Sequence, residues 1–264
     1  MTKDMTNGKP IKLILGFAVP LLLGNLFQQF YNLVDTVIVG KVLGVNSLAA
    51  VGSTGSINFL IIGFCMGICN GFAIPVAQSF GAKNDKTLRK YVANSTWLAL
   101  LFAVIMTIAT IILCKPILRL MRTPDDIFTG AYTYIVIIFA GIPATILYNM
   151  VSGILRAMGD SKTPLYFLIL SAFLNIFLDL FCIIVLHMGV AGAAVATVVS
   201  QAVSGVSCLL YMRKKFDILH IRKDEWKLES QYVKNLCSMG IPMGLQYSVT
   251  AIGSVILQLS LIHI

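Results

Sequence analysis

Charged residues are scarce in this chain of 264 residues. Asp, Glu, Lys and Arg together make up 12% of the sequence, whereas 58% of it is hydrophobic and the mean hydropathy is +0.87. Soluble domains carry about a quarter charged residues. The deficit excludes an ordinary soluble domain and predicts an all-α, polytopic membrane helical bundle.

Motifs for covalent, metal or nucleotide chemistry are also lacking. The six cysteines include no Cys-x-x-Cys pair and no spacing that suits zinc, so we expect them to serve packing. The stretch GDSKT (159–163) lacks the consecutive Gly-Lys-Ser/Thr of a phosphate-binding loop. No nucleophile and base stand together on a loop. The sequence therefore predicts neither an enzyme nor a bound cofactor.

Long apolar runs are what the sequence does have. About 20 apolar residues cross a bilayer as a helix, and seven runs reach that length between short polar connections. The first run is expected to be a membrane span and not a cleavable signal, because no small-residue cleavage site follows a short apolar region. The predicted spans are 13–38, 50–77, 91–113, 129–153, 164–186, 190–211 and 236–258.

The longest polar stretch, 212–235, divides the chain. Residues 1–211 are predicted to form a six-helix lobe, and residues 236–258 are predicted to be the seventh span, where a second lobe would begin. The stretch between them is either a cytoplasmic linker or an amphipathic helix lying at the membrane interface. The segments around Pro20 and Pro242 resemble each other, as in transporters built from duplicated bundles.

Lys and Arg are distributed unequally between the two sides of the predicted bundle. Sixteen of the twenty fall in the N-terminal tail and in the connections after the second, fourth and sixth spans. By the positive-inside rule, this places the N-terminus in the cytoplasm. The basic pI of 9.3 then reflects topology, so we do not expect a nucleic-acid partner. The four on the opposite side are Lys41, Lys115, Arg119 and Arg122.

Two of the eleven acidic residues, Asp35 and Asp179, lie inside predicted spans. A charge at the centre of a spanning helix costs about 2.5–3.5 kcal/mol on insertion scales, so ionisable residues there are usually functional. Both have polar neighbours on the same helix face, and lipid offers such faces no hydrogen bonds, so they must look inward. These neighbours are Asn25, Gln28, Asn32 and Asn175.

A third polar face, on the sixth span, contains Thr197, Gln201 and Ser204. Taken alone, these residues are better explained by hydrogen bonding between helices. Such bonding accounts less well for Asp35 and Asp179, because Asn or Ser would supply the same bonds without an ionisable group. The three faces together predict a cation or proton site in the interior of the bundle.

Four stretches resemble the multidrug and toxic compound extrusion (MATE) transporters, and the resemblance covers nearly the whole chain. Members of this family have twelve spans in two six-helix lobes and export amphiphilic, often cationic compounds in exchange for H⁺ or Na⁺. The resemblance therefore implies such an antiporter in a prokaryotic inner membrane, with small molecules and membrane lipids as partners. The stretches are VPLLLGNLFQQFYNLVDTVIVGKVLGVNSLAAVG from Val19, QSFGAKN from Gln78, GILRAMGDSKTP from Gly153 and LNIFLDL from Leu174.

The resemblance also implies a cation site in the N-terminal lobe, for H⁺ or Na⁺ and for no other metal. Its residues in the family are a first-span Asp, an Asn-x-x-x-Asp pair in the fifth span and a Thr in the sixth. These correspond to Asp35, Asn175, Asp179 and Thr197. A fourth-span Tyr matches Tyr134, and the second acidic position is similar to the DinF-type branch. The candidates for the substrate cavity are Gln28, Asn32 and Gln201.

The chain departs from the family pattern in its length. It stops in the seventh span, so most of the C-terminal lobe, the expected partner of the first lobe, is missing. The last six residues, LSLIHI (259–264), match one reading frame of a common transposase sequencing adapter. We therefore expect a library artefact at this end and a longer natural gene. Transport activity is expected of the full-length parent protein.

Two other functions stay open at this point. A lipid-linked oligosaccharide flippase of related fold would line its cavity with Arg or Lys to hold phosphates, whereas the basic residues here fall at connections, tails or span ends. A structural or receptor-like membrane protein would use the polar faces only for packing. Neutralising Asp35 and Asp179 would then leave every activity intact.

Overall fold

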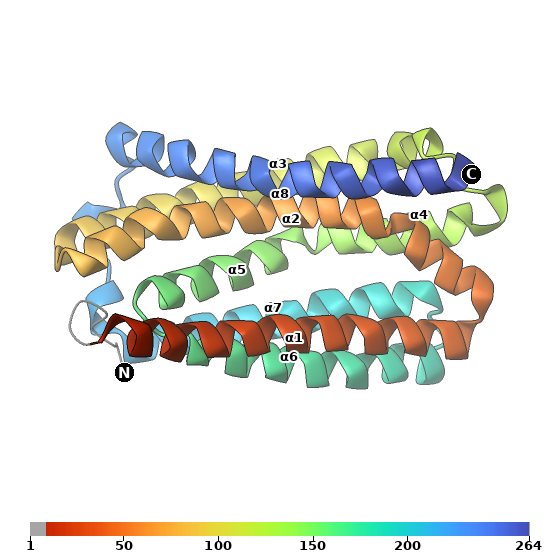
Figure 1. Cartoon of the computed structure of the whole chain (residues 1–264), viewed down its shortest axis with the longest axis horizontal. Coiled ribbons are helices and arrows are strands. Elements are labelled where there is room, and N and C mark those ends of the chain that lie inside the picture. The colour runs from red at the N-terminus through yellow and green to blue at the C-terminus, as the bar shows by residue number, and fades with distance from the viewer. Residues whose placement is uncertain (1–8, 264) are drawn as a thin grey trace.

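Helices form all of the regular structure in the part of the chain that the structure describes. The computed structural model describes residues 9–263, with the side chains of all but 10, 223, 224 and 254–263. The long helices lie side by side along one axis (Figure 1). The elements are α1 Pro10–Leu43, α2 Val45–Gly81, α3 Asp85–Leu120, α4 Asp125–Ala140, α5 Ile142–Ala157, α6 Lys162–Leu180, the π-helix η1 Phe181–Val185, α7 Val190–Lys215, the 3₁₀ helices η2 Asp217–Leu219 and η3 Lys223–Trp226, and α8 Ser230–His263.

Five of the first six predicted spans coincide with helices that are each long and apolar enough to cross a membrane, and the fourth coincides with a bent pair of helices that is long enough only when taken together. The five are α1, α2, α3, α7 and the continuous pair α6–η1. The seventh predicted span lies within α8. The expected sequencing artefact comprises residues 259–264. Their side chains lie outside the described residues, so the structure does not test the prediction of an artefact. An all-α bundle of membrane-spanning helices is thus confirmed.

The fourth predicted span is not one straight helix but two, α4 and α5, which meet at an angle of 45°. The break falls at Gly141, and Pro143 stands in the first turn of α5, where its missing N–H disturbs no helical hydrogen bond. A Cβ atom at Gly141 would collide with the side chain of Val198 on α7. Glycine at the bend therefore lets α7 approach the broken span closely.

A glycine contact joins α2 to α8. The four-residue spacing of Gly63, Gly67 and Gly71 predicts a close helix contact, and the structure confirms it. A Cβ atom at Gly67 would lie 2.7 Å from the Cα of Gly244 and 2.6 Å from the carbonyl oxygen of Met243. The two helices therefore touch backbone to backbone, which fixes α8 against the lobe.

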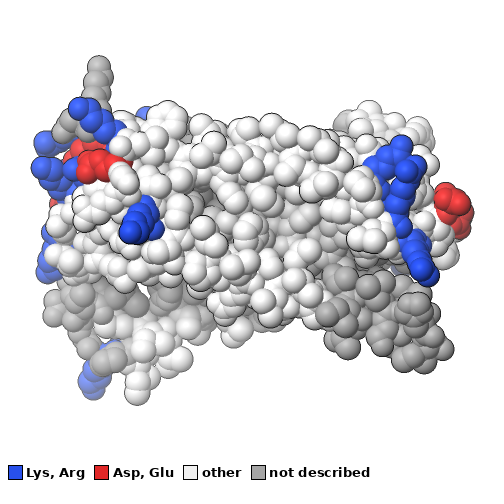
Figure 2. All heavy atoms as spheres, turned by 90° about the horizontal axis from the view of Figure 1, so that it is seen from above, with Lys and Arg blue, Asp and Glu red and all other residues white. Residues whose placement is uncertain are grey.

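The surface of the bundle is apolar along most of its length. Figure 2 shows Lys and Arg gathered at the two ends of the molecule, with an uncharged zone between them. On α1, the side chains of Leu22, Leu26, Phe30 and Leu33 are exposed. A continuous apolar surface between two charged ends is what a membrane-embedded bundle requires.

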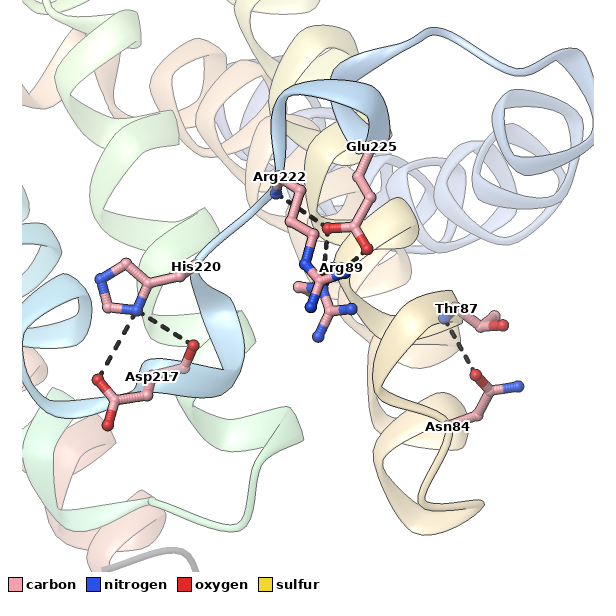
Figure 3. A network of polar contacts seen from close by, with 7 residues as sticks. All are labelled: Asn84, Thr87, Arg89, Asp217, His220, Arg222 and Glu225. Atoms are coloured by element: carbon pink, nitrogen blue, oxygen red, sulfur yellow. Dashed lines mark hydrogen bonds and ion pairs between the residues drawn. The ribbon is translucent and has the colours of Figure 1, made fainter.

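The polar stretch after α7 is docked on α3 and does not form the amphipathic helix that was one of the two alternatives. Glu225 accepts hydrogen bonds from Nε of Arg89 at 2.8 and 3.0 Å (Figure 3). Trp97 donates its indole N–H to the carbonyl oxygen of Trp226 at 3.2 Å, and the two rings meet edge to face. Asn94 accepts from the backbone N–H of Glu229. These bonds hold residues 216–229 as an ordered linker.

Candidate cation site and central cavity

Two buried carboxyl groups from distant parts of the chain meet inside the bundle. Asp35 on α1 is 8% exposed and Asp179 on α6 is fully buried. Their side chains lie within hydrogen-bonding reach of each other. Such a bond requires a proton on one of them, because two carboxylates have no donor to share. In the described part of the chain, no hydrogen-bond donor reaches Oδ1 of either residue.

Asn175 connects this pair to α7. With its amide oriented to satisfy both of its polar atoms, it donates to Oδ2 of Asp179 at 3.0 Å and accepts from the backbone N–H of Thr197 at 3.2 Å. The amide also lies 3.3 Å from the hydroxyl oxygen of Thr197. Asp179 and Asn175 are four residues apart on α6, so one helix face carries both groups. The α-helix ends one residue after Asp179, where the wider η1 turn begins.

Two tyrosines complete the surroundings of the acidic pair. Tyr134 on α4 is 7% exposed, and the field at its hydroxyl comes from Asp35, Tyr31 and Asp179. The hydroxyl of Tyr31 hydrogen-bonds Thr197. Tyr31 was not among the predicted site residues. It stands four residues before Asp35, a spacing that places both on one face of α1 and that would have identified it.

A cavity of about 500 Å³ opens beside the acidic pair. The carboxyl group of Asp35 is on its wall, whereas Asp179 and Asn175 lie behind it in the protein interior. Thr145 on α5 donates to Oε1 of Gln201 at 2.6 Å across this wall. The lining includes Gln28, Asn32, Asp35, Tyr134, Thr197 and Gln201.

The structure therefore brings all eight predicted site residues into one region, although their functional roles stay predictions. Thr145 and Asn58 are further polar lining residues that the sequence did not single out. Ser204, the third member of the α7 face, donates to the carbonyl oxygen of Phe167 at 2.7 Å. Its contact joins two helices, as expected of a residue that serves packing.

Arg156 occupies a different environment from the one predicted for it. The sequence placed it with the surface charges of a connection, but it lies in the last turn of α5 and is only half-exposed. Its guanidinium group donates to Oδ1 of Asn70 on α2 at 3.1 Å, and Asn70 lies 3.5 Å from the hydroxyl of Tyr247 on α8. This short polar chain crosses the contact between α2 and α8.

The donor set of the acidic pair fits a proton or a hard monovalent cation. Carboxylate, amide and hydroxyl oxygens are ligands for hard cations, whereas soft metals prefer sulfur or imidazole. No group of three or more His, Cys, Asp or Glu side chains gathers in the described residues. Binding of H⁺ or Na⁺ at these residues stays a prediction.

A multi-pass helical bundle with a buried acidic pair beside a polar cavity defines a membrane protein of the transporter class. The chain belongs to the MatE family, the multidrug and toxic compound extrusion transporters, whose family model matches residues 20–181. A curated relative, the probable multidrug resistance protein YoeA of Bacillus subtilis (strain 168), is 34% identical over 248 residues. That match covers 90% of this chain and 53% of YoeA.

Solved structures of transporters have the same fold. A MOP superfamily transporter from Pyrococcus furiosus Vc1 superimposes with a TM-score of 0.85 at 28% identity, over 92% of this chain and 54% of that one. The outward-facing conformation of a multidrug resistance MATE family transporter gives 0.85 at 29% identity, over 91% and 53%. The chain thus spans about half the length of the relatives and structures that it matches.

Proposed function

We propose that the chain is the cation-binding lobe of an antiporter that exports amphiphilic or cationic compounds in exchange for H⁺ or Na⁺. The observation that carries this proposal is the contact between Asp35 and Asp179 beside the central cavity. The name of the relative YoeA, a probable multidrug resistance protein, supports the choice of cargo. The proposal concerns the assembly of this lobe with a second one.

The charge on the acidic pair couples the two transport events. Without a cation, two neighbouring carboxylates repel each other, whereas a proton or Na⁺ removes the repulsion and holds α1 against α6. The two states of the lobe then differ in shape and in their affinity for a cationic compound in the same cavity. Such a difference in affinity is what couples cation entry to the release of the exported compound.

The lining of the central cavity favours a cationic cargo over an anionic one. Asp35 is the charged residue that lines it, whereas Arg156 lines a smaller adjoining cavity of about 120 Å³ that shares Gln28 and Gln201 with it. A lipid-linked oligosaccharide carries phosphates, which would need cationic partners. The carboxyl group of Asp35 therefore supports export of cationic amphiphiles, and the single cation Arg156 is fewer than a phosphate-binding cavity would need.

The proposed location is a prokaryotic inner membrane, with the N-terminus in the cytoplasm. The end of the bundle that holds the start of α1, the end of α2 and the linker carries most of the Lys and Arg residues. The positive-inside rule assigns such an end to the cytoplasm.

Dye efflux tests this function. Cells that express the full reading frame containing the chain are loaded with a cationic amphiphilic dye, and efflux is followed under an imposed H⁺ or Na⁺ gradient. Wild-type protein is expected to export the dye. An Asp35→Asn, Asp179→Asn double variant is expected to lose the part of the dye efflux that depends on the gradient. Asp126→Asn, an exposed carboxylate in the first turn of α4, is the matched control. Efflux at the wild-type rate in the double variant would overturn the proposal.

A further inference from the structure

A second cavity lies between α3, α5, α7 and the linker, among residues that do not line the central one. Its volume is about 430 Å³, within the range of about 300–1,000 Å³ that is usual for small-molecule sites. Its inner wall is apolar and buried, with Ala99 and Ala103 on α3 and Met150 and Ile154 on α5. Nothing in the proposed antiport mechanism uses this space.

The cavity has the depth of one membrane leaflet. Its wall on α3 runs from Val92, near the basic end of the bundle, to Ala103. At 1.5 Å per residue, this distance is about 16 Å, and half of a typical hydrocarbon core is about 15 Å. Leu100, which also lines the cavity, is 58% exposed. The apolar space is therefore reachable from the lipid-facing side of α3.

The mouth of the cavity at the basic end is polar and cationic. Arg213, His220 and Trp226 line it, and all three are exposed. Among the described residues, Arg213 forms no ion pair with a carboxylate. Tryptophan is enriched where a membrane protein meets the headgroup layer, because its ring is apolar and its N–H is polar.

Two carboxylates of the linker are paired with basic residues of α3. Glu225 is paired with Arg89 at 2.8 Å, and Glu229 with Lys90 at 2.7 Å. The carboxylate of Asp217 lies 3.7 Å from the imidazole ring of His220 (Figure 3). Arg213, which forms no ion pair in the described part of the chain, presents its positive charge at the opening of an apolar cavity.

We propose that this cavity is a binding site for an anionic phospholipid. One acyl chain fills the apolar space between α3 and α5, and the phosphate group binds Arg213 beside Trp226. Basic pockets between membrane helices on the cytoplasmic side bind anionic headgroups in this way. The positive charge at the mouth disfavours the cationic compounds that the central cavity is proposed to take, so the two sites select opposite charges.

The two tryptophans make this site directly measurable. Trp97 and Trp226 are the two tryptophans of the chain, and their rings lie 6.2 Å apart at the mouth of the cavity. Lipids with brominated acyl chains quench tryptophan fluorescence on contact. The chain is reconstituted in phosphatidylcholine vesicles that contain equal mole fractions of either brominated phosphatidylglycerol or brominated phosphatidylcholine. We expect about fivefold tighter apparent binding of the anionic lipid, the preference that one basic residue near the membrane surface supplies.

Three variants separate a specific site from the general lipid annulus. Arg213→Gln is expected to remove the preference, whereas Lys214→Gln, an exposed neighbour that does not line the cavity, is expected to keep it. Thr96→Phe places a ring at the exposed mouth and is expected to weaken quenching by the anionic lipid without disturbing the core. Equal quenching by the two lipids in the wild type would overturn the proposal. So would equal losses in Arg213→Gln and Lys214→Gln.

Discussion

Asp35 on α1 and Asp179 on α6 hold their carboxyl groups within hydrogen-bonding reach of each other. Pairs of carboxyl groups this close share a proton, because like charges at such a distance cannot both be present without a large cost. Here each group also keeps an oxygen atom without a hydrogen-bond partner in the described part of the chain. The repulsion between the two carboxylates gives the pair a physical reason to bind a positive charge.

Replacing Asp35 by Asn is expected to keep the fold and abolish the coupling. The amide of Asn can hydrogen-bond the Asp179 carboxylate, so the contact survives without a shared proton or cation. Gradient-driven dye efflux should fall by about 5–150-fold, the usual range of a coupling free energy between two sites. Efflux and the melting temperature are measured on the same preparations. A folded variant with undiminished gradient dependence would contradict the role of the pair.

Replacing Asn175 by Leu is expected to destabilise the protein. The change leaves Oδ2 of Asp179 without the donor that it now has, whereas the N–H of Thr197 lies within α7 and keeps a helical acceptor. A buried polar group without a partner costs about 1–3 kcal/mol. The comparison variant is Asn32→Leu, an exposed side chain on α1, for which the change should stay within about 0.5 kcal/mol. Thermal or denaturant unfolding in detergent measures both. Equal stabilities of the two variants would contradict the bridging role of Asn175.

Replacing Gly67 by Ala is expected to push α2 and α8 apart. The added Cβ would meet backbone atoms of α8 at 2.6 and 2.7 Å, and backbone cannot turn aside as a side chain can. Overpacking of this kind costs about 1–3 kcal/mol. Gly55 lies on the same helix with nothing within 4 Å of an added Cβ, so Gly55→Ala should instead stabilise α2 by up to about 1 kcal/mol. Opposite shifts in melting temperature are expected, and equal shifts would contradict the contact.

Replacing Glu225 by Gln is expected to loosen the linker in a pH-dependent way. Hydrogen bonds from Arg89 hold the pKa of the Glu225 carboxyl below its usual range. Because the pKa is lower in the folded chain than in the unfolded one, the pair stabilises the fold above the ordinary pKa of glutamate. That stability is lost as the pH falls through the lowered value. At neutral pH, the variant should lose about 1.5–3 kcal/mol, since the bonds involve a charged group that is 3% exposed.

The measurement is the melting temperature of wild type and Glu225→Gln from about pH 7 down to about pH 3, across the range where carboxyl groups titrate. The difference in melting temperature between wild type and Glu225→Gln should become smaller as the pH falls. Glu229→Gln is the control, because its carboxylate is 38% exposed and pairs with Lys90 at the surface. Its effect should be below about 1 kcal/mol. A gap that is constant across the whole pH range would show that the Arg89 pair does not carry the difference.

Local spacing in the sequence singled out Asp35, Asp179 and Asn175, whereas Tyr134 and the role of Thr197 were predicted only from the resemblance to the MATE family. Asp35 and Asp179 stood out because an acid inside an apolar run is costly to insert and is seldom needed for packing. Asn175 followed from its position four residues before Asp179. Tyr31 was missed because an aromatic residue in a spanning helix resembles ordinary lipid-facing side chains. Its hydrogen bond to Thr197 depends on how α1 and α7 pack, which one helix does not reveal.

The features that the sequence did not predict depend on contacts between residues far apart in the chain. Arg89 and Glu225 are 136 residues apart, so the docking of the linker on α3 leaves no local pattern. The bend at Gly141 lies where Val198 of α7 approaches, a contact between distant residues that leaves no room for a Cβ atom. By contrast, the close contact of α2 was predictable from glycine spacing, although its partner helix α8 was not.

Infrared spectroscopy of the purified chain tests the central claim most directly. The C=O stretch of a protonated carboxyl group is recorded while H⁺ or Na⁺ is varied, in wild type and in the Asp35→Asn, Asp179→Asn double variant. The acidic pair predicts a band in the wild type that responds to the cation and is absent from the double variant. The same cation-dependent band in the double variant, or no such band in the wild type, would contradict a cation site at Asp35 and Asp179.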